Sequence, residues 1–292
     1  MSAGRRLHAL HVLDHSLPQH SGYVFRTQGL LQAIRACGIE TSHLTSTKHP
    51  GPNGDLEVVD GFEFYRTYAS SGLLGSLPAG EYAAVVVDLY RRLCSVIDRI
   101  KPDLLHVHSP CLNGVAGLLA ARRFGLPMLY EMRASWDDAA VSHGSTSEGS
   151  LRYRLSRALE TLVLQRATAV STICAGLKQD IVARGINPHR VTIVPNAIDA
   201  DLAAAKVDAQ VPDVLSKHAG KTSLGYFGSC YRYEGLHLLL DAIAVLRGKG
   251  LDFVVFLIGN GPERDNLIAQ AEANRSIECI EFIERVSHDQ IA

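Results

Sequence analysis

Short apolar runs alternate with longer segments of helical spacing through the first two thirds of this chain. The apolar runs predict buried strands at residues 7–13, 40–44, 62–65, 104–107, 128–132, 169–172 and 191–194. The segments between them predict helices that include residues 82–100, 112–124 and 151–166. Strands that alternate with helices of this length are typical of a parallel sheet covered on both faces. We therefore expect residues 1–199 to form a complete Rossmann-like domain.

The same alternation restarts after residues 200–220, which are rich in Ala and Asp and have no strand pattern. Predicted strands follow at residues 223–227, 253–258 and 277–282, with helices at residues 236–247 and 262–274. The predicted fold class is α/β, with two doubly wound parallel-sheet domains facing a cleft, residues 1–199 and residues 200–292. The second domain stops at Ala292, so we expect it to be incomplete.

Composition and charge narrow the class of protein. The 292 residues are 47% hydrophobic and 20% charged with a formal net charge of −1, which is typical of a globular protein and does not favour nucleic acid as a partner. The six cysteines include no Cys-x-x-Cys pair, which fits a reducing cytoplasm. Polar residues interrupt the N-terminal strand, so it lacks the apolar core of a signal peptide, and no apolar stretch is long enough to cross a membrane. We expect a cytoplasmic protein.

A glycine loop at the start of the second half is a candidate for phosphate binding. Gly228 ends the strand predicted at 223–227, and Gly235 opens the next helix after a loop that contains Ser229 and Arg232. Glycine lets the backbone approach a ligand, and a helix N-terminus offers free N–H groups to a phosphate. Arg232 would add a fixed positive charge. The alternative interpretation is a plain surface turn.

A second glycine loop, with Gly259 and Gly261, follows the strand predicted at 253–258. Pro262 is expected at the first helical position, where its fixed φ favours helix entry. Arg264 stands in the place of the third glycine of a dinucleotide fingerprint, which disfavours a nicotinamide-dependent dehydrogenase.

Polar residues of the first half lie at the ends of predicted strands. Ser21 and Gly22 lie in the loop after the first strand, and His106 and His108 flank Val107, so the two imidazoles share one face of the sheet. Three interpretations are open for the two histidines: metal ligands, polar residues of a ligand cleft, or core histidines with satisfied hydrogen bonds. The metal is least favoured because no Cys, Asp or Glu ligand follows locally.

An acceptor platform is one interpretation of Trp136 and Asp137, which follow Arg133 at the end of the strand predicted at 128–132. The indole would stack on a sugar or a lipid headgroup, and the alternative is a buried tryptophan at the base of a loop. The helix predicted at 151–166 alternates arginines with leucines. Such a face either docks on anionic lipids or is a solvated cationic face.

Four motifs, in their order along the chain, resemble the family 4 glycosyltransferases of the GT-B fold. The family's linker motif, Val/Ile-Pro-Asn-Gly-x-Asp, is similar to residues 194–199, which include Asn196 and Asp199. The next motif, Gly-Arg followed by Glu-Lys-Gly, imperfectly matches residues 225–235. The family's Gly-x-Gly-Pro motif matches residues 259–262.

The fourth motif, Phe-x-Gly-x-Val, is similar to residues 282–286, where Glu284 replaces the glycine and Arg285 follows it. Three segments more specifically resemble the bacterial subgroup linked to exosortase and exopolysaccharide loci: residues 12–26, 130–140 and 226–235. The family's Glu-x7-Glu motif, which holds the donor sugar and ribose, would lie beyond Ala292. The chain therefore resembles a C-terminally truncated member.

The resemblance implies that the second half binds a nucleotide-sugar donor and the first half binds the acceptor. The implied donor-binding residues are Gly228, Ser229, Arg232, Gly235, Gly259, Gly261 and Arg285. The implied acceptor-side residues are Ser21, Gly22, His106, Trp136 and Asp137. We expect His108 and Arg133 at the reaction face, with no metal and no cofactor beyond the nucleotide sugar as co-substrate.

Two departures from the family change how these residues would work. The family's phosphate-binding arginine and lysine align with Ser229 and Glu234, so Arg232 would have to supply the positive charge. The family's common histidine aligns with Arg133, whose fixed charge cannot act as a base. Arg133 would instead orient the acceptor or stabilise phosphate.

The resemblance thus implies a retaining hexosyltransferase-type glycosyltransferase that uses a lipid-linked or saccharide acceptor in polysaccharide biosynthesis. Peripheral contact with the inner membrane face is a further hypothesis. One alternative is a nucleotide-sugar 2-epimerase of the same fold, which would need no acceptor. Another is a catalytically inactive fragment that keeps only the acceptor contacts.

Overall fold

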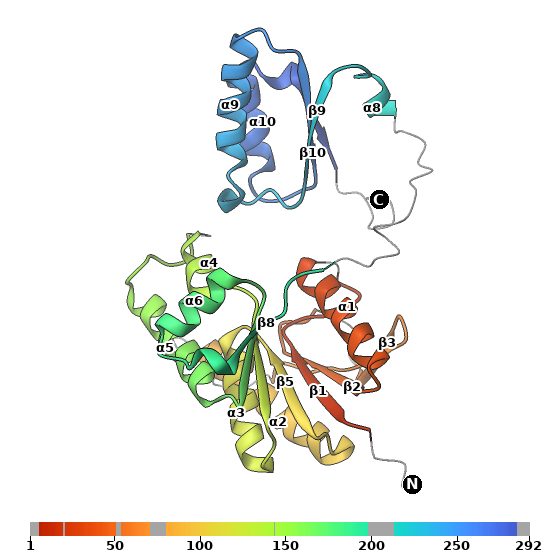
Figure 1. Cartoon of the computed structure of the whole chain (residues 1–292), viewed down its shortest axis with the longest axis vertical. Helices are drawn as coiled ribbons and strands as arrows, with labels where there is room; N and C mark the ends of the chain where they lie inside the picture. Colours follow the sequence, from red (N-terminus) through yellow and green to blue (C-terminus); the bar gives the residue numbers. More distant parts are fainter. Residues whose placement is uncertain are drawn as a thin grey trace. The chain divides into compact units, whose positions relative to one another are not determined.

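The computed structural model describes residues 6–19, 21–50, 54–70, 80–142, 144–197 and 213–284. The chain forms two compact units (Figure 1). Unit 1 consists of residues 1–139 and 146–198, and unit 2 consists of residues 199–292 together with residues 140–145. The predicted boundary at Asp199 lies outside the described residues.

Unit 1 is built on an eight-stranded sheet in the order β3-β4-β2-β1-β5-β6-β7-β8. Its strands are β1 (His8–Leu13), β2 (Glu40–Thr45), β3 (Leu56–Val59), β4 (Phe62–Tyr65), β5 (Leu104–His108), β6 (Met128–Met132), β7 (Ala169–Thr172) and β8 (Val191–Ile193). β3 pairs antiparallel with β4, and all other neighbours pair parallel. The predicted α/β fold class is confirmed.

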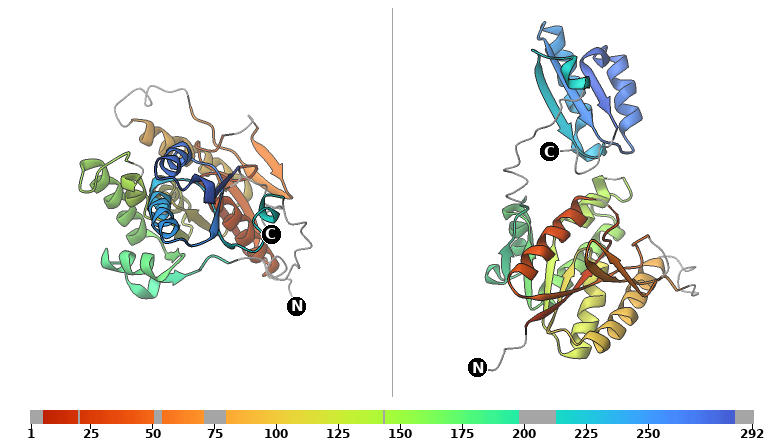
Figure 2. Two further views of the ribbon diagram at one scale, coloured as in Figure 1. Left: turned by 90° about the horizontal axis from the view of Figure 1, so that it is seen from above. Right: turned by 90° about the vertical axis from the view of Figure 1, so that its right-hand side faces the viewer.

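Helices cover both faces of this sheet (Figure 2). They are α1 (Gly22–Ala36), α2 (Gly80–Ile100), α3 (Cys111–Phe124), α4 (Trp136–Ser142), α5 (Leu151–Arg166) and α6 (Ala175–Ala183), with a short 3-10 turn η2 (Pro188–Arg190). Leu105 and Val107 of β5 belong to the large apolar core with α2 and α3. Because side chains alternate along a strand, His106 and His108 of β5 lie on the opposite face.

The sequence prediction lacked strand β3 and the short helix α4. β3 forms a hairpin with β4, and its turn residues, Asp60 and Gly61, have φ of 51° and 74°. Asp-Gly with positive φ at both positions is the signature of a tight hairpin turn, so this dipeptide was the available signal. The short helix α4 starts at Trp136, where a loop was expected. None of the described helices is long and apolar enough to cross a membrane.

Unit 2 contains a parallel three-stranded sheet in the order β11-β10-β9. Its elements are α8 (Asp213–Ser216), β9 (Thr222–Phe227), η3 (Arg232–Glu234), α9 (Leu236–Gly248), β10 (Phe253–Ile258), α10 (Arg264–Ala273), η4 (Ile277–Cys279) and β11 (Ile280–Ile283). Helices α9 and α10 pack on one face of the sheet (Figure 1). Pro262 precedes α10 by two residues, so its predicted place at the first helical position is wrong. The sequence also predicts a helix that begins near His288, and that segment lies outside the described residues.

Candidate functional site

A row of histidines crosses the sheet of unit 1 beneath α1. The parallel register places His11 of β1 opposite His43 of β2 on one side and opposite His106 of β5 on the other. Two residues after His106 in β5, His108 lies opposite Glu131 of β6. All five side chains are buried. The predicted pairing of His106 and His108 on one face is confirmed, since their rings stack with centroids 4.3 Å apart.

Glu131 is the centre of this cluster. Its Oε1 accepts hydrogen bonds from Nε and Nη2 of Arg26, at 3.0 and 2.9 Å, and from Nε of Arg133 at 3.1 Å. Its Oε2 lies 3.0 Å from Nε2 of His106. Burial alone would raise the pKa of Glu131, but the hydrogen bond from His106 and the charges of the two arginines hold this pKa well below its usual range. The carboxylate is therefore ionised at neutral pH.

A hydrogen-bonded chain of side chains runs from Arg133 to His11. Nη2 of Arg133 donates to Nδ1 of His108 at 2.5 Å, and Nε2 of His108 lies 3.1 Å from Nδ1 of His11. A guanidinium only donates, so His108 must carry its proton on Nε2 and donate it to His11. Burial first, and then neighbouring positive charge, lowers the pKa of His108 and of His11 well below the usual value. Both imidazoles are neutral, and Nε2 of His11 has no hydrogen-bond partner in the described structure.

The same three imidazoles have the composition of a metal site. One nitrogen each of His11, His106 and His108 lies within 4.8 Å of the others. The guanidinium of Arg133, however, occupies the second nitrogen of His108 and thereby keeps the proton on the nitrogen that would bind a metal. It also places a positive charge beside the cluster. These observations favour the interpretation of His106 and His108 as satisfied core histidines over metal ligands.

Arg26 connects this cluster to the segment that leaves unit 1. Its Nη2 donates to the carbonyl of Val194 at 2.7 Å, and its Nη1 donates to the carbonyl of Pro195 at 2.9 Å and to Oδ1 of Asn196 at 3.0 Å. The predicted linker residue Asn196 is thus held on unit 1 by the arginine that also binds Glu131. Sequence reasoning missed Arg26 because its partners lie more than 100 residues away. The other linker residue, Asp199, is outside the described part of the chain.

The structure places the remaining acceptor-side candidates in different environments. Ser21 caps α1, with its hydroxyl accepting from the backbone N–H of Val24, and Gly22 begins the helix. Trp136 is 37% exposed, so the alternative of a buried tryptophan is wrong. Asp137 is buried and pairs with Nη1 of Arg157 at 3.1 Å. Its carboxylate is therefore engaged within unit 1.

The two glycine loops of unit 2 are packed directly against each other. A Cβ on Gly259, whose φ is 140°, would lie 1.8 Å from the carbonyl oxygen of Gly228, and a Cβ on Gly261 would lie 2.6 Å from the backbone nitrogen of Cys230. Backbone hydrogen bonds join the loops, including one from Cys230 to the carbonyl of Asn260 at 3.1 Å. Glycine is therefore required at 259 and 261 for the close approach of one loop to the other.

Arg232 and Gly235 complete the first of these loops. The side chain of Arg232 is 66% exposed, and its Nη1 lies 3.7 Å from a carboxylate oxygen of Glu263. Gly235 has φ of 73° and is the N-cap of α9, as predicted. The carbonyl of Ser229 accepts from the hydroxyl of Tyr226 at 3.0 Å. The last donor-side candidate, Arg285, lies outside the described residues.

Two known domain families match this chain. Residues 21–197 match the family described as glycosyl transferase 4-like domain. Residues 209–292 match the family described as glycosyl transferases group 1. The first match corresponds to most of unit 1 and the second to most of unit 2.

Among curated proteins, the chain is similar to 2-deoxystreptamine glucosyltransferase of Streptomyces kanamyceticus, with 29% identity over 182 residues that cover 59% of this chain and 46% of that protein. It is also similar to GDP-mannose-dependent alpha-mannosyltransferase of Mycobacterium tuberculosis, with 26% identity over 257 residues that cover 88% of this chain and 63% of that protein. The matched region thus spans roughly half of the length of these relatives.

Solved structures share the fold. Sucrose-phosphate synthase from Thermosynechococcus elongatus superposes with a TM-score of 0.71 and 17% identity over 98% of this chain and 72% of that chain. Anabaena HepE in complex with UDP-glucose gives 0.62 with 15% identity, covering 96% and 69%. UDP-N-acetylglucosamine 2-epimerase gives 0.58 with 14% identity, covering 97% and 70%. At these identities the likeness shows the fold alone.

Proposed function

Since this chain belongs to the group 1 glycosyltransferases of the GT-B fold, we propose that it transfers a sugar from a nucleotide-diphosphate sugar to an acceptor. We further propose that the reaction retains the configuration of the sugar. The acceptor is lipid-linked or a saccharide, and the product serves polysaccharide biosynthesis. The resemblance of three segments to the exopolysaccharide-associated subgroup supports this choice of acceptor.

Unit 2 is the proposed donor-binding unit. Its two interlocked glycine loops follow the carboxyl ends of β9 and β10, where parallel α/β sheets bind ligands. Arg232 is the exposed cation of the first loop, and it supplies the charge that the family's arginine and lysine would supply elsewhere. HepE, which shares the fold, was solved with UDP-glucose. The observation that carries the proposal is this pair of loops in a chain of this family.

Unit 1 is the proposed acceptor-binding unit, with Trp136 as the stacking surface. His108 and Arg133 are buried. Arg133 donates hydrogen bonds to Glu131, to Thr27 and to His108. We therefore assign His108 and Arg133 to positioning the strand ends that carry the acceptor. No metal is part of the proposed mechanism, because the diphosphate is stabilised by Arg232 and the α9 N-terminus.

Calorimetric titration of the 292-residue chain with UDP and GDP, each with and without a divalent metal, tests the donor site. We expect one of the two nucleotides to bind, with an affinity that a chelator does not change. UMP is the matched control, because it keeps the base and lacks the second phosphate, and it should bind more weakly. If the folded chain binds neither diphosphate, the donor site is not formed by these loops.

The 2-epimerase is the competing activity, because such an enzyme shares this fold with a TM-score of 0.58. An epimerase converts its nucleotide sugar without an acceptor, whereas a transferase needs one. Incubation of UDP-sugars with the chain alone, followed by NMR of the sugar, separates the two. An epimerised nucleotide sugar would contradict the transferase.

A further inference from the structure

Helix α5 exposes a row of four leucines, Leu151, Leu155, Leu159 and Leu162, which are 74%, 55%, 38% and 42% accessible. We call them the leucine stripe. Their spacing of four, four and three residues places them on one side of a helix. Single exposed leucines are ordinary, but a contiguous apolar row on the surface marks an interaction site.

Arginines border the stripe on both sides. At about 100° per residue, Arg152 lies along one edge and Arg154 along the other, and Arg166 lies in line with the stripe at its C-terminal end. The single acidic residue of α5, Glu160, points to the other side of the helix, where it is buried and accepts the hydroxyl of Tyr130 at 2.5 Å. The outward side of α5 is therefore apolar along its middle and cationic at its edges.

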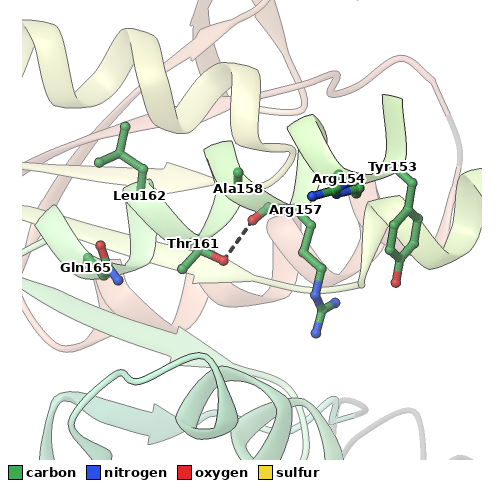
Figure 3. A pocket seen from close by; sticks show the side chains of 7 residues that line it. All are labelled: Tyr153, Arg154, Arg157, Ala158, Thr161, Leu162 and Gln165. Atoms are coloured by element: carbon green, nitrogen blue, oxygen red, sulfur yellow. Dashed lines mark hydrogen bonds between the residues drawn. The ribbon is translucent and has the colours of Figure 1, made fainter. Parts of the chain in front are cut away.

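A groove of about 500 Å³ is lined by side chains of α5 (Figure 3), and Leu162 belongs both to the groove and to the stripe. The groove is lined by Tyr153, Arg154, Arg157, Ala158, Thr161, Leu162 and Gln165. Arg157, which lines the groove, is held by Asp137 and Asp180, at 3.1 and 2.8 Å. Arg154 also lines the groove.

An aromatic residue lies at the N-terminal end of this surface. The guanidinium of Arg152 lies 5.8 Å from the ring centre of Tyr82, which is 37% exposed and belongs to α2. Tyrosine rings are favoured where apolar and aqueous surroundings meet. The surface thus combines apolar, cationic and interfacial side chains on two neighbouring segments.

We propose that this face of α5 docks on the surface of a membrane that contains anionic lipids. The leucines enter the boundary between headgroups and acyl chains, while the arginines extend to the phosphates. The absence of an acidic side chain on the outward side of α5 favours an anionic partner over a second copy of this chain. The inference rests on the proposed function in one respect, since a lipid-linked acceptor is presented at such a surface.

Vesicle flotation of the 292-residue chain tests the surface directly. We expect the chain to float with phosphatidylcholine vesicles that contain phosphatidylglycerol, and to float less with phosphatidylcholine alone or at high salt. A double variant, Leu151→Gln with Leu155→Gln, should lower the partition coefficient at least about tenfold, because both apolar side chains are lost. The matched control is Leu238→Gln with Val245→Gln on α9, which are 63% and 58% exposed and should change nothing.

Arg154→Gln with Arg166→Gln separates the charge from the apolar contact. This variant should weaken flotation with the anionic vesicles and reduce its salt dependence. The proposal is overturned if the chain does not float at low salt, or if the leucine variant floats like the control. It is also overturned if the stripe variant instead converts a dimer to a monomer in light scattering. Titration with UDP on the same samples reports the donor site independently, so a failure of one proposal is distinguishable from a failure of the other.

Discussion

Units 1 and 2 differ in whether their charged side chains are buried or exposed. Unit 1 buries ionised and polar side chains in its core, among them Arg66, Arg133, Glu131 and Glu160. In the described part of unit 2, Ser276 is the one buried polar side chain, and Arg232 is largely exposed. Unit 1 therefore uses its buried charges to fix its own geometry, whereas the guanidinium of Arg232 in unit 2 remains accessible to a ligand.

The largest effect is expected where the buried charges of unit 1 are unbalanced. Glu131→Gln leaves Arg26 and Arg133 without their common carboxylate, and breaking a buried ion pair in this way costs about 3–5 kcal/mol of unfolding free energy. Urea unfolding followed by the fluorescence of Trp136, the single tryptophan, reports this loss from unit 1.

Asp98→Asn is the control for that substitution. Asp98 pairs with Lys101 at 3.1 Å, but both side chains are more than half exposed, so the pair contributes at most about 1 kcal/mol. If Glu131→Gln costs no more than Asp98→Asn, the buried network does not hold unit 1 together, and the contrast between the units is lost.

The next effect is steric and falls on unit 2. Gly259→Ala places a methyl group 1.8 Å from the carbonyl oxygen of Gly228 at φ of 140°, so the two loops must separate, at a cost of about 2–4 kcal/mol. We expect faster hydrogen exchange in β9 and β10 together with loss of UDP binding.

Gly248→Ala is the matched substitution without the clash. Gly248 lies in α9, and an added Cβ would meet nothing within 4 Å, so alanine should be neutral or stabilise the helix slightly. Normal UDP binding by Gly259→Ala would show that the interlocked loops are not the donor site.

Acid provides a third test, because a buried neutral histidine resists protonation. Burial lowers the pKa of His43 to about 4, from about 6.5 in the unfolded chain. The unfolded state therefore binds more protons below pH 6.5, and the stability that His43 contributes is present above that pH and is lost as the pH falls toward 4. Between pH 7 and pH 5 this one residue accounts for about 2 kcal/mol.

The unfolding free energy of His43→Gln should therefore fall by about 2 kcal/mol less than that of the unchanged chain between pH 7 and pH 5. Urea unfolding of both proteins at the two pH values measures this difference. Glu160, whose pKa burial raises to about 7, contributes the opposite dependence. It is present in both proteins and cancels. Equal pH dependence of the two proteins would mean that His43 is solvated in unit 1.

The sequence predicted the positions of most strands and helices along the chain well, because these depend on local periodicity, as in β10 and α5. It also paired His106 with His108, which are two residues apart. It did not find His11 as their neighbour, since the register of β1 against β5 joins residues about 95 positions apart. It also did not find Arg26, whose partner Glu131 is 105 positions away. The resemblance implies Gly259 as a donor-binding residue, but a glycine pattern alone could not show that the loop of Gly228 packs directly against it.

The smallest effect on stability, and a specific one on binding, is expected for Arg232→Ala. The ion pair of Arg232 with Glu263 spans 3.7 Å on the surface, so its loss should change the unfolding free energy by less than about 0.5 kcal/mol. A charge-assisted hydrogen bond to the donor diphosphate, partly screened by solvent, is worth about tenfold in affinity for UDP and little for UMP. Lys249→Ala removes the same charge at the opposite end of α9 and should leave both affinities unchanged. Equal losses in the two variants would mean that Arg232 attracts the nucleotide only through net charge, and the accessible cation of unit 2 would then not be a binding group.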